Sequence, residues 1–313
     1  QVSGSSTNGT GVELAGNVSN SNVTGQGNTA GVNVSGNVIN GSVNGTSANG
    51  TAVNVTGTAT VNGTEVSGSS TNGTGVELAG NVSNSNVTGQ GNTAGVNVSG
   101  NVTNGSVNGT SANGTAVNVT ETATLNGTTI AGNSTNGTGV ELAGNTSNSH
   151  ITGDSVSGNG VKLENGSHAS DSSITGNSVN GSGVHSNGTV QLNGTVVNGA
   201  SKNGEGLTIN GTLSHDSSSD INSSSGNGLS GGTTNSSGLG SYNQLVRQDA
   251  INSRLQNLSE YHRGYMVPDE VPLPVNIWEG TPENAEINIC DGKQCQSLSV
   301  DIAKPGEMTP HNQ

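Results

Sequence analysis

The chain has 313 residues and a formal net charge of −14 at pH 7, and only 9% of its residues are charged. Hydrophobic residues make up 27%, little more than half the share found in an ordinary globular domain, and phenylalanine is absent. This composition excludes a conventional globular core, and the scarcity of Lys and Arg argues against nucleic acid or an anionic membrane surface as a partner. Two interpretations remain: a disordered polar tract, or a thin solenoid around a narrow core of small aliphatic side chains.

The first predicted element is a long internal repeat. Residues 2–65 (block 1) recur almost letter for letter as residues 66–129 (block 2). The blocks differ only where Ile39, Gly57, Val61 and Glu65 face Thr103, Glu121, Leu125 and Thr129. A third, more diverged copy begins near Ile130 and a partial fourth near Val197. A fixed period of this kind predicts an elongated array in which each copy packs on its neighbours.

A shorter period of about 20–23 residues runs inside each block, marked by GVEL at 11–14, GVNV at 31–34 and AVNV at 52–55. Alternating valines flanked by Gly and Asn are typical of half-buried strands ended by tight turns, and both residues tolerate positive φ. We therefore predict an all-β fold, a right-handed parallel β-solenoid over residues 1–215. About ten coils at about 4.8 Å each give a length of about 50 Å. The valine pairs recur in phase with the short period. This favours the solenoid over disorder, since a disordered spacer would not need valines in register.

The chain changes character after the repeats. Residues 216–242 are rich in Ser and Gly and predict a flexible linker. Apolar residues at helical spacing then predict an amphipathic helix over 243–266, which a Pro-rich stretch ends. Alternation resumes around a Cys-Asp-Gly-Lys-Gln-Cys segment, and its Asp291-Gly292 dipeptide predicts a small hairpin.

The two cysteines, Cys290 and Cys295, enclose four residues. A structural disulfide, typical of an oxidising compartment, is the favoured interpretation. A zinc half-site is the alternative, but zinc needs about four ligands and only His262 and His311 lie nearby. A redox pair needs two intervening residues and a thioredoxin-like context, and neither is found here.

The densest motif is the sequon Asn-x-Ser/Thr, which occurs about 30 times and marks acceptors for Asn-linked sugars. A chain this rich in Asn, Ser and Thr also produces many sequons by chance. The candidate glycosylation sites are Asn8, Asn17, Asn22, Asn44, Asn62, Asn108, Asn126, Asn187 and Asn210.

Catalysis on a solenoid needs carboxylates or basic groups gathered on one face. The aspartates are scattered, at Asp154, Asp171, Asp216 and Asp220, whereas Glu13 and Glu77 hold equivalent positions and indicate a solvated face. Single histidines at His150, His168, His185 and His215 are predicted to be surface residues. We therefore predict no enzymatic activity, metal or cofactor. Ice binding needs a long Thr-x-Thr face, and the regular blocks offer one such pair each.

No apolar run approaches the length of about 18 residues that a membrane-crossing helix needs. The chain lacks an initiator Met, and Gln1 directly precedes a repeat. We expect it to be a fragment or processed piece of a longer protein, with any export signal upstream.

The repeats at residues 1–215 resemble the shaft of filamentous-haemagglutinin-like exoproteins, which Gram-negative bacteria export by two-partner secretion. The tail, residues 243–313, resembles the C-terminal end of the high-molecular-weight adhesins of that group, whose near-terminal cysteine pair matches Cys290 and Cys295. The resemblance implies a secreted adhesin retained at the outer membrane, where a disulfide loop holds its end in the transporter.

The same resemblance implies an outer-membrane transporter and a host-cell glycan or protein receptor as partners, and glycans on some sequons. Two other functions stay open: a β-solenoid carbohydrate-active enzyme, and a biofilm or surface-layer component that binds no specific receptor.

Overall fold

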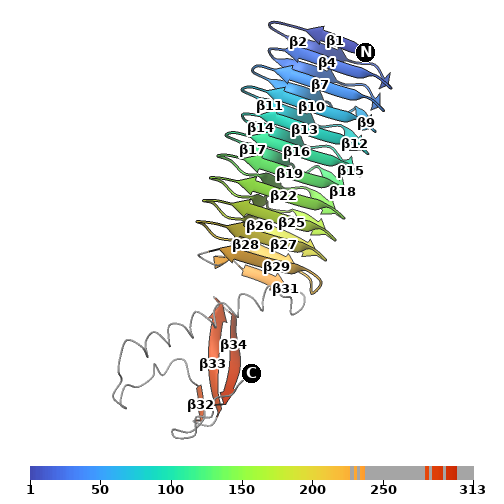
Figure 1. Ribbon diagram of the computed structural model, residues 1–313. Helices are drawn as coiled ribbons and strands as arrows, with labels where there is room; N and C mark the ends of the chain where they lie inside the picture. Colours follow the sequence, from blue (N-terminus) through green and yellow to red (C-terminus); the bar gives the residue numbers. More distant parts are fainter. Residues whose placement is uncertain (226–228, 231–232, 237–278, 282–283, 292–293, 302–313) are drawn as a thin grey trace. The chain divides into compact units, whose positions relative to one another are not determined.

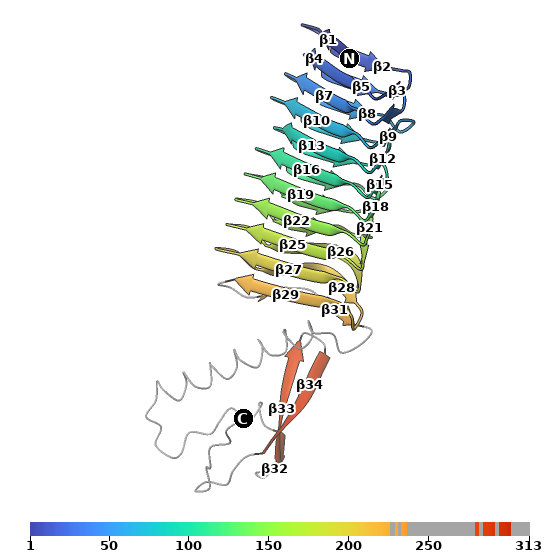
Figure 2. The same cartoon turned by 45° about the vertical axis from the view of Figure 1, so that its right-hand side comes forward.

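The computed structural model describes residues 1–225, 229–230, 233–236, 279–281, 284–291 and 294–301. Residues 1–242 form one compact unit and residues 243–313 a second. In the first unit the chain winds through about ten coils of short strands, and every coil pairs in parallel with the next (Figures 1 and 2). The predicted all-β parallel β-solenoid is confirmed.

Face A, one wall of the solenoid, is an 11-stranded parallel sheet to which each coil gives one strand. In order these strands are β1 (Val2–Ser5), β4 (Asn22–Gly27), β7 (Ser42–Ser47), β10 (Glu65–Ser70), β13 (Asn86–Gly91), β16 (Ser106–Ser111), β19 (Thr129–Ser134), β22 (His150–Ser155), β25 (Ser173–Ser178), β27 (Val196–Ser201) and β29 (Asp220–Ser225). Val23, Val43 and Val66 are register partners, so two successive coils are 20 and 23 residues long. The predicted short period is therefore the coil length.

Two further stacks, faces B and C, close each coil. Face B contains β2 (Thr10–Leu14), β5 (Ala30–Val34), β8 (Thr51–Val55), β11 (Thr74–Leu78), β14 (Ala94–Val98), β17 (Thr115–Val119), β20 (Val140–Leu142), β23 (Val161–Leu163) and β30 (Leu229–Ser230). Face C contains β3 (Val18–Ser19), β6 (Val38–Ile39), β9 (Thr60–Asn62), β12 (Asn81–Ser83), β15 (Val102–Thr103), β18 (Thr124–Asn126), β21 (Asn145–Ser147), β24 (His168–Ser170) and β31 (Thr233–Ser236). The long strands β26 (Val184–Asn193) and β28 (Leu207–His215) run through both faces and link them.

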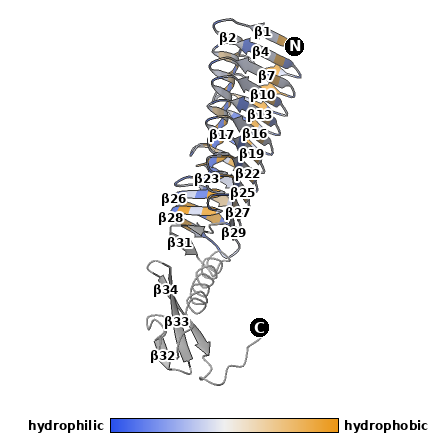
Figure 3. Ribbon diagram, turned by 60° about the vertical axis from the view of Figure 1, so that its left-hand side comes forward, coloured by the Kyte–Doolittle hydropathy of each residue, from blue (hydrophilic) through white to orange (hydrophobic). Residues whose placement is uncertain are grey.

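The core is a set of inward columns of Val, Leu, Ile and Ala. Val43, Val76 and Leu142 are 0 to 1% exposed, and equivalent residues lie directly above and below them. Figure 3 shows apolar residues following one another from coil to coil along the strands. Burying a side chain of this size contributes roughly 1.5–3 kcal/mol, and a narrow core gains enough only by repeating the contact in every coil.

A glycine column makes the core thin. Gly25, Gly45 and Gly68 are register partners on the inner side of face A. A Cβ added to Gly45 would lie 2.1 Å from the carbonyl oxygen of Ala52 on face B, and the other two meet face B in the same way. Only Gly lets two backbones approach this closely, so faces A and B pack main chain against main chain.

The corner between faces C and A, the C–A corner, turns through one residue with positive φ in nine successive coils. This position is held by Asn20, Asn40, Gly63, Asn84, Asn104, Gly127, Asn148, Asp171 and Gly194, with φ between 47° and 59°. Asn and Asp are the side-chain-bearing residues that tolerate this region best. Gly63 and Gly127 stand where Oδ1 of Asn40 or Asn104 lies 2.5 or 2.6 Å from the place of a Cβ. The expected use of Asn and Gly at the corners is confirmed.

The stack extends past residue 215, into the segment predicted to be a linker. Ile221 on β29 is 1% exposed and is the register partner of Val197, while β30 and β31 pair with β28. One well-placed isoleucine is enough to continue the inward column. The predicted helix over 243–266 lies outside the described residues.

The second unit contains β32 (Glu279–Thr281), β33 (Asn284–Asp291) and β34 (Gln294–Asp301), which pair antiparallel in that order. Cys290 on β33 and Cys295 on β34 are direct register partners. Residues 292–293, which hold part of the predicted turn, and the cysteine side chains lie outside what is described, so the disulfide stays a prediction.

Candidate functional site

An asparagine ladder runs along the edge between faces A and B. The amide Nδ2 of Asn49 donates to Oδ1 of Asn28 at 2.7 Å, and Nδ2 of Asn72 donates to Oδ1 of Asn49 at 2.9 Å. Asn92, Asn113 and Asn136 repeat this pattern in block 2 and beyond. Stacked amides satisfy one another from coil to coil, so this edge stabilises the rod through its own hydrogen bonds.

A buried serine column supports the same edge from inside. Ser47 Oγ donates to the carbonyl oxygen of Asn28 at 3.0 Å and accepts from the N–H of Gly50 at 3.0 Å. Ser70, Ser111, Ser134 and Ser178 bond to their neighbours in the same manner. The hydroxyls are committed to the backbone, as buried polar groups must be, and are not poised as nucleophiles.

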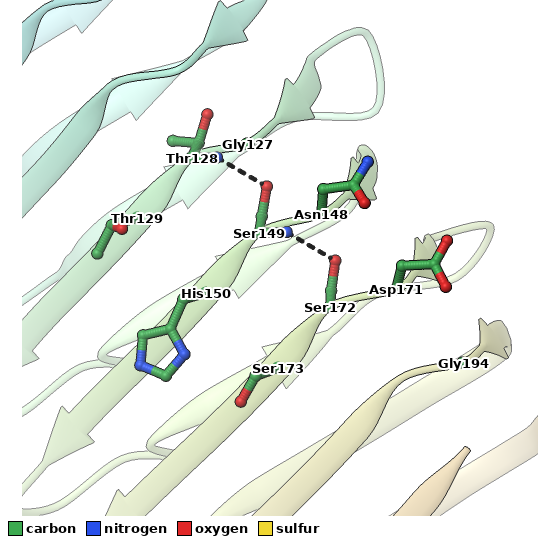
Figure 4. A pocket seen from close by; sticks show the side chains of 10 residues that line it. All are labelled: Gly127, Thr128, Thr129, Asn148, Ser149, His150, Asp171, Ser172, Ser173 and Gly194. Carbon is green, nitrogen blue, oxygen red and sulfur yellow. Dashed lines mark hydrogen bonds between the residues drawn. The ribbon is translucent and has the colours of Figure 1, made fainter. Parts of the chain in front are cut away.

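A shallow groove of about 650 Å³ lies along the C–A corner (Figure 4). Ser149 Oγ accepts from the Thr128 N–H at 3.0 Å, and Ser172 Oγ accepts from the Ser149 N–H at 3.1 Å. His150 and Asp171 stand on opposite sides of this serine line in Figure 4. The groove is an open polar surface whose buried hydroxyls already bind main chain.

The nine predicted glycosylation residues all lie on the solenoid, and seven of them are exposed. Those seven are Asn8, Asn17, Asn22, Asn44, Asn108, Asn126 and Asn210, whereas Asn62 and Asn187 are half-buried. On face A, Asn44 and Thr46 are both exposed, because residues two apart on a strand share one side. A sequon in this position offers its amide and hydroxyl together to solvent.

Other sequons are tied into the fold. Thr64, the hydroxyl residue of the Asn62 sequon, is 2% exposed and donates to the carbonyl oxygens of Asn62 and Val38. Thr128 does the same for the Asn126 sequon. Further along the rod, Asn210 donates to Asn187 at 3.1 Å and Asn187 donates to Glu164 at 2.9 Å. The structure thus separates exposed sequons from sequons whose side chains are hydrogen-bonded within the fold, a distinction that the sequence does not show.

An ion cluster on the outside of face B was not foreseen from the sequence. Lys162 Nζ lies 3.4 Å from Glu141 Oε1 and also contacts Glu164. Thr115 donates to Glu141 at 3.3 Å from the coil before it, and Asn187 donates to Glu164 from the coil after it. The available signal is spacing, since Glu141 and Lys162 are 21 residues apart and hence one coil apart.

The cluster shifts the pKa values of its members. Burial raises the pKa of Glu141, and a hydrogen bond with Glu164 adds to the rise against the opposing charge of Lys162. Burial also acts to raise the pKa of Glu164, but hydrogen bonds from Glu141, Lys162 and Asn187 outweigh it and lower the pKa to about 2. Burial, and then the charge of Lys162, lower the pKa of His185. The arrangement is a carboxylate pair bridged by an ammonium group.

The remaining predicted charged residues are dispersed. Glu13 and Glu77 are exposed at equivalent face B positions, with Asn33 and Asn54 between them in the same column. Among the histidines, His150 is exposed, while His168 and His185 are half-buried.

The surface prediction for His215 is wrong. This side chain is 3% exposed because it takes the inward column position below Leu192 on face C.

Within the described ranges, no three His, Cys, Asp or Glu side chains come together as a metal site. No helix among the described residues is long and apolar enough to cross a membrane. The chain matches no protein-family model, and a comparison with curated proteins finds no match.

Proposed function

We propose that this chain is the C-terminal part of a secreted bacterial surface adhesin. A right-handed solenoid shaft carries a binding region away from the cell, and a Cys290–Cys295 loop holds the other end in an outer-membrane two-partner-secretion transporter. The observation that supports the proposal most is the stack of similar coils, each of which pairs through its strands with the next. A rod of this kind transmits position over distance without a globular core.

Two features of the surface agree with that role. The outward columns of blocks 1 and 2 carry amides and hydroxyls with few charges, so the shaft presents a uniform, hydrated exterior. Several sequons, such as Asn44-Gly45-Thr46, hold the amide and the hydroxyl on the solvent-exposed side of face A. Glycans there would add bulk and solubility. The partner of the shaft would be a host-cell glycan or protein.

The anchor is tested by replacing Cys290 and Cys295 with Ser, singly and together, in the full exoprotein. Register partners in antiparallel strands sit at a separation that a disulfide spans, so the loop is compatible with the pairing of β33 and β34. We expect cell-retained protein to fall and shed protein to rise in all three variants. A Ser297→Ala variant on β34 is the control. Unchanged retention in the double variant would refute anchoring.

A second function follows from the same uniform surface. A polar shaft that binds no specific receptor would serve as a biofilm or surface-layer component. Binding of the purified, folded shaft to host cells separates the two functions: saturable binding that competes with excess unlabelled shaft supports the adhesin. Linear, non-competed binding supports the matrix component.

A further inference from the structure

Each of the two regular blocks contains five Asn-Gly dipeptides. They begin at Asn8, Asn40, Asn44, Asn49 and Asn62 in block 1, and at Asn72, Asn104, Asn108, Asn113 and Asn126 in block 2. Asn is a chemically labile residue, and a following Gly leaves its own backbone nitrogen unshielded. We propose that Asn40 and Asn104 are sites of spontaneous succinimide formation and deamidation, and that the fold protects the other eight. This inference is independent of the proposed function.

The reaction needs only water. The backbone nitrogen of Gly41 attacks Cγ of Asn40, a C–N bond forms, the bond from Cγ to Nδ2 breaks, and ammonia leaves with the amide proton. Water then adds to one of the two carbonyl carbons of the five-membered succinimide ring and opens a ring C–N bond. One direction gives aspartate, and the other gives isoaspartate, whose main chain is longer by one methylene group.

Eight of the ten glycine N–H groups are held by the fold. Ser47 Oγ accepts from Gly50 at 3.0 Å, and the carbonyl oxygen of Ser83 accepts from Gly63 at 3.1 Å. Gly9, Gly73, Gly114 and Gly127 are bound in the same two ways. Gly45 and Gly109 lie inside β7 and β16, which pair with a neighbouring strand on both sides. A nitrogen whose N–H is bonded in a rigid ladder does not turn toward the side chain before it.

The peptide groups after Asn40 and Asn104 differ from all of these. Within residues 2–129, the N–H of Gly41 and the carbonyl of Asn40 have no hydrogen-bond partner, and the same holds for Gly105 and Asn104. Both asparagines are exposed, and Gly41 and Gly105 are half-buried. These two peptide groups lie at the C–A corner, between β6 and β7 and between β15 and β16. They can rotate without breaking any hydrogen bond.

That rotation produces the geometry for attack. Asn40 and Asn104 have φ of 53° and 51°, in the left-handed region where ψ is about +30° to +60°. There the following nitrogen points away from the side chain. Turning the peptide plane over moves ψ to about −120° to −150°, which brings the nitrogen beside Cβ while φ stays positive. Gly41 and Gly105 absorb the matching change in their own φ.

Neighbouring coils supply controls within the same column. Gly63 and Gly127 replace Asn at this corner in the following coil, so their coils hold no reactive amide there. Asn20 and Asn84 also have positive φ, but Ser21 and Ser85 follow them, and a side chain on the next residue shields the nitrogen. The product would place one new negative charge per block on coils that carry few charges.

The experiment incubates the purified folded chain at mildly alkaline pH and 37 °C as a time course. Cleavage after glutamate and tandem mass spectrometry locate each deamidated residue, and labelling by isoaspartyl methyltransferase reports isoaspartate. We expect Asn40 and Asn104 to react at least about tenfold faster than Asn72, Asn108 and Asn113, because those require a hydrogen bond to break first. In denaturant, all ten dipeptides should react at similar rates.

Two variants at the first site keep Asn104 as an internal reference. Asn40→Asp copies the residue found at position 171 and should slow the reaction at position 40, because a carboxylate at mildly alkaline pH is a poor target for attack by the Gly41 nitrogen. Asn40→Gly copies position 63 and should abolish it. Thermal melts confirm that both variants fold. Equal reaction of the ten sites in the folded chain, or faster reaction at Asn72 than at Asn104, would overturn the proposal.

Discussion

The regular coils of residues 2–129 and the diverged coils of residues 130–225 share one architecture with different exteriors. The diverged coils keep the inward column, with Ile130, Ile151 and Ile174 in register, and the glycine column through Gly199. Their outer face B column reads Glu141, Lys162 and His185, where blocks 1 and 2 carry two Asn and one Glu per block. The comparison teaches that the inward columns and corners specify the rod, while the outside is free to change.

The diverged coils also carry polar groups in the core. Thr146 and Ser167 are 2% exposed and Ser186 is 0% exposed, and their hydroxyls have no hydrogen-bond partner among the described residues. Thr146 stands directly below Leu125, and Ser186 directly below Leu163. An unpaired buried hydroxyl costs about 1–3 kcal/mol. We therefore expect the diverged coils to open before the regular ones.

Replacing Gly109 with Val should destabilise the fold most, because it disrupts the close approach of faces A and B that the regular and the diverged coils share. Its Cβ would lie 2.1 Å from the carbonyl oxygen of Ala116, a contact that only a backbone shift relieves. We expect a loss of about 3 kcal/mol or more, or failure to fold, measured by chemical denaturation followed by circular dichroism.

The matched control for this change is Asn108→Thr on the outer side of the same strand. Thr88 holds the equivalent position in the coil before, so the change should stay within about 0.5 kcal/mol of the parent. Equal tolerance of the two variants would contradict the close approach of faces A and B.

Exchanging Thr and Val in one inward column tests whether buried, unpaired hydroxyls make the diverged coils less stable than the regular ones. Thr146→Val removes an unpaired buried hydroxyl and should stabilise the diverged coils by about 1–2 kcal/mol. Val102→Thr places a hydroxyl at the same column position of a regular coil and should cost about 1–3 kcal/mol. Hydrogen exchange, read region by region, measures both. A loss of stability in Thr146→Val would show that the hydroxyl is satisfied, for instance by a bound water.

The sequence predicts the solenoid well because its determinants are local and repeated. The valine pairs such as Val32 and Val34 mark one strand of each coil, and their spacing equals the coil length. Asn and Gly at positive φ mark the corner for a similar reason. The sequence pattern does not reveal β29, because Ile221 is a single apolar residue among serines.

The features that the sequence did not reveal depend on contacts between coils. The cluster of Glu141, Lys162 and Glu164 joins residues of two successive coils, and it forms because the register places Lys162 directly beside Glu141. The burial of His215 depends on which side of β28 faces inward. Sequence shows which residues are present, whereas register decides which of them meet.

The asparagine ladder allows a smaller test of the same comparison. Asn113 donates to Asn92 and accepts from Asn136, so Asn113→Ala should cost about 1 kcal/mol in thermal or chemical unfolding. The ladder is interrupted at Ser157, which stands between Asn136 and Asn180. Ser157→Asn should restore it and stabilise the diverged coils by up to about 1 kcal/mol. If Ser157→Asn does not raise the stability, the asparagine ladder stabilises only the regular blocks.

The smallest effect concerns the ion cluster, which only the diverged coils possess. Glu164 has a pKa of about 2 against an ordinary 4.5, so it stabilises the fold above pH 4.5 and loses that contribution as the pH falls toward 2. Glu141 has a raised pKa, so its contribution is present below pH 4.5 and is lost as the pH rises. The contributions of Glu164 and Glu141 change with pH in opposite directions, so together they stabilise the fold most near pH 4.5.

Glu164→Gln should therefore lower the Tm at pH 7 and leave it unchanged at pH 2. The loss in free energy of unfolding at pH 7 should be about 0.5 kcal/mol, because solvent screens this partly exposed site. Glu141→Gln should abolish the rise in Tm that the parent shows as the pH falls from 7 to 4.5. Glu77→Gln, which removes one carboxylate from the same face in a regular coil, is the matched control. An identical profile for Glu164→Gln and Glu77→Gln would show that the ion cluster adds no pH dependence, and that the two regions differ only in their cores.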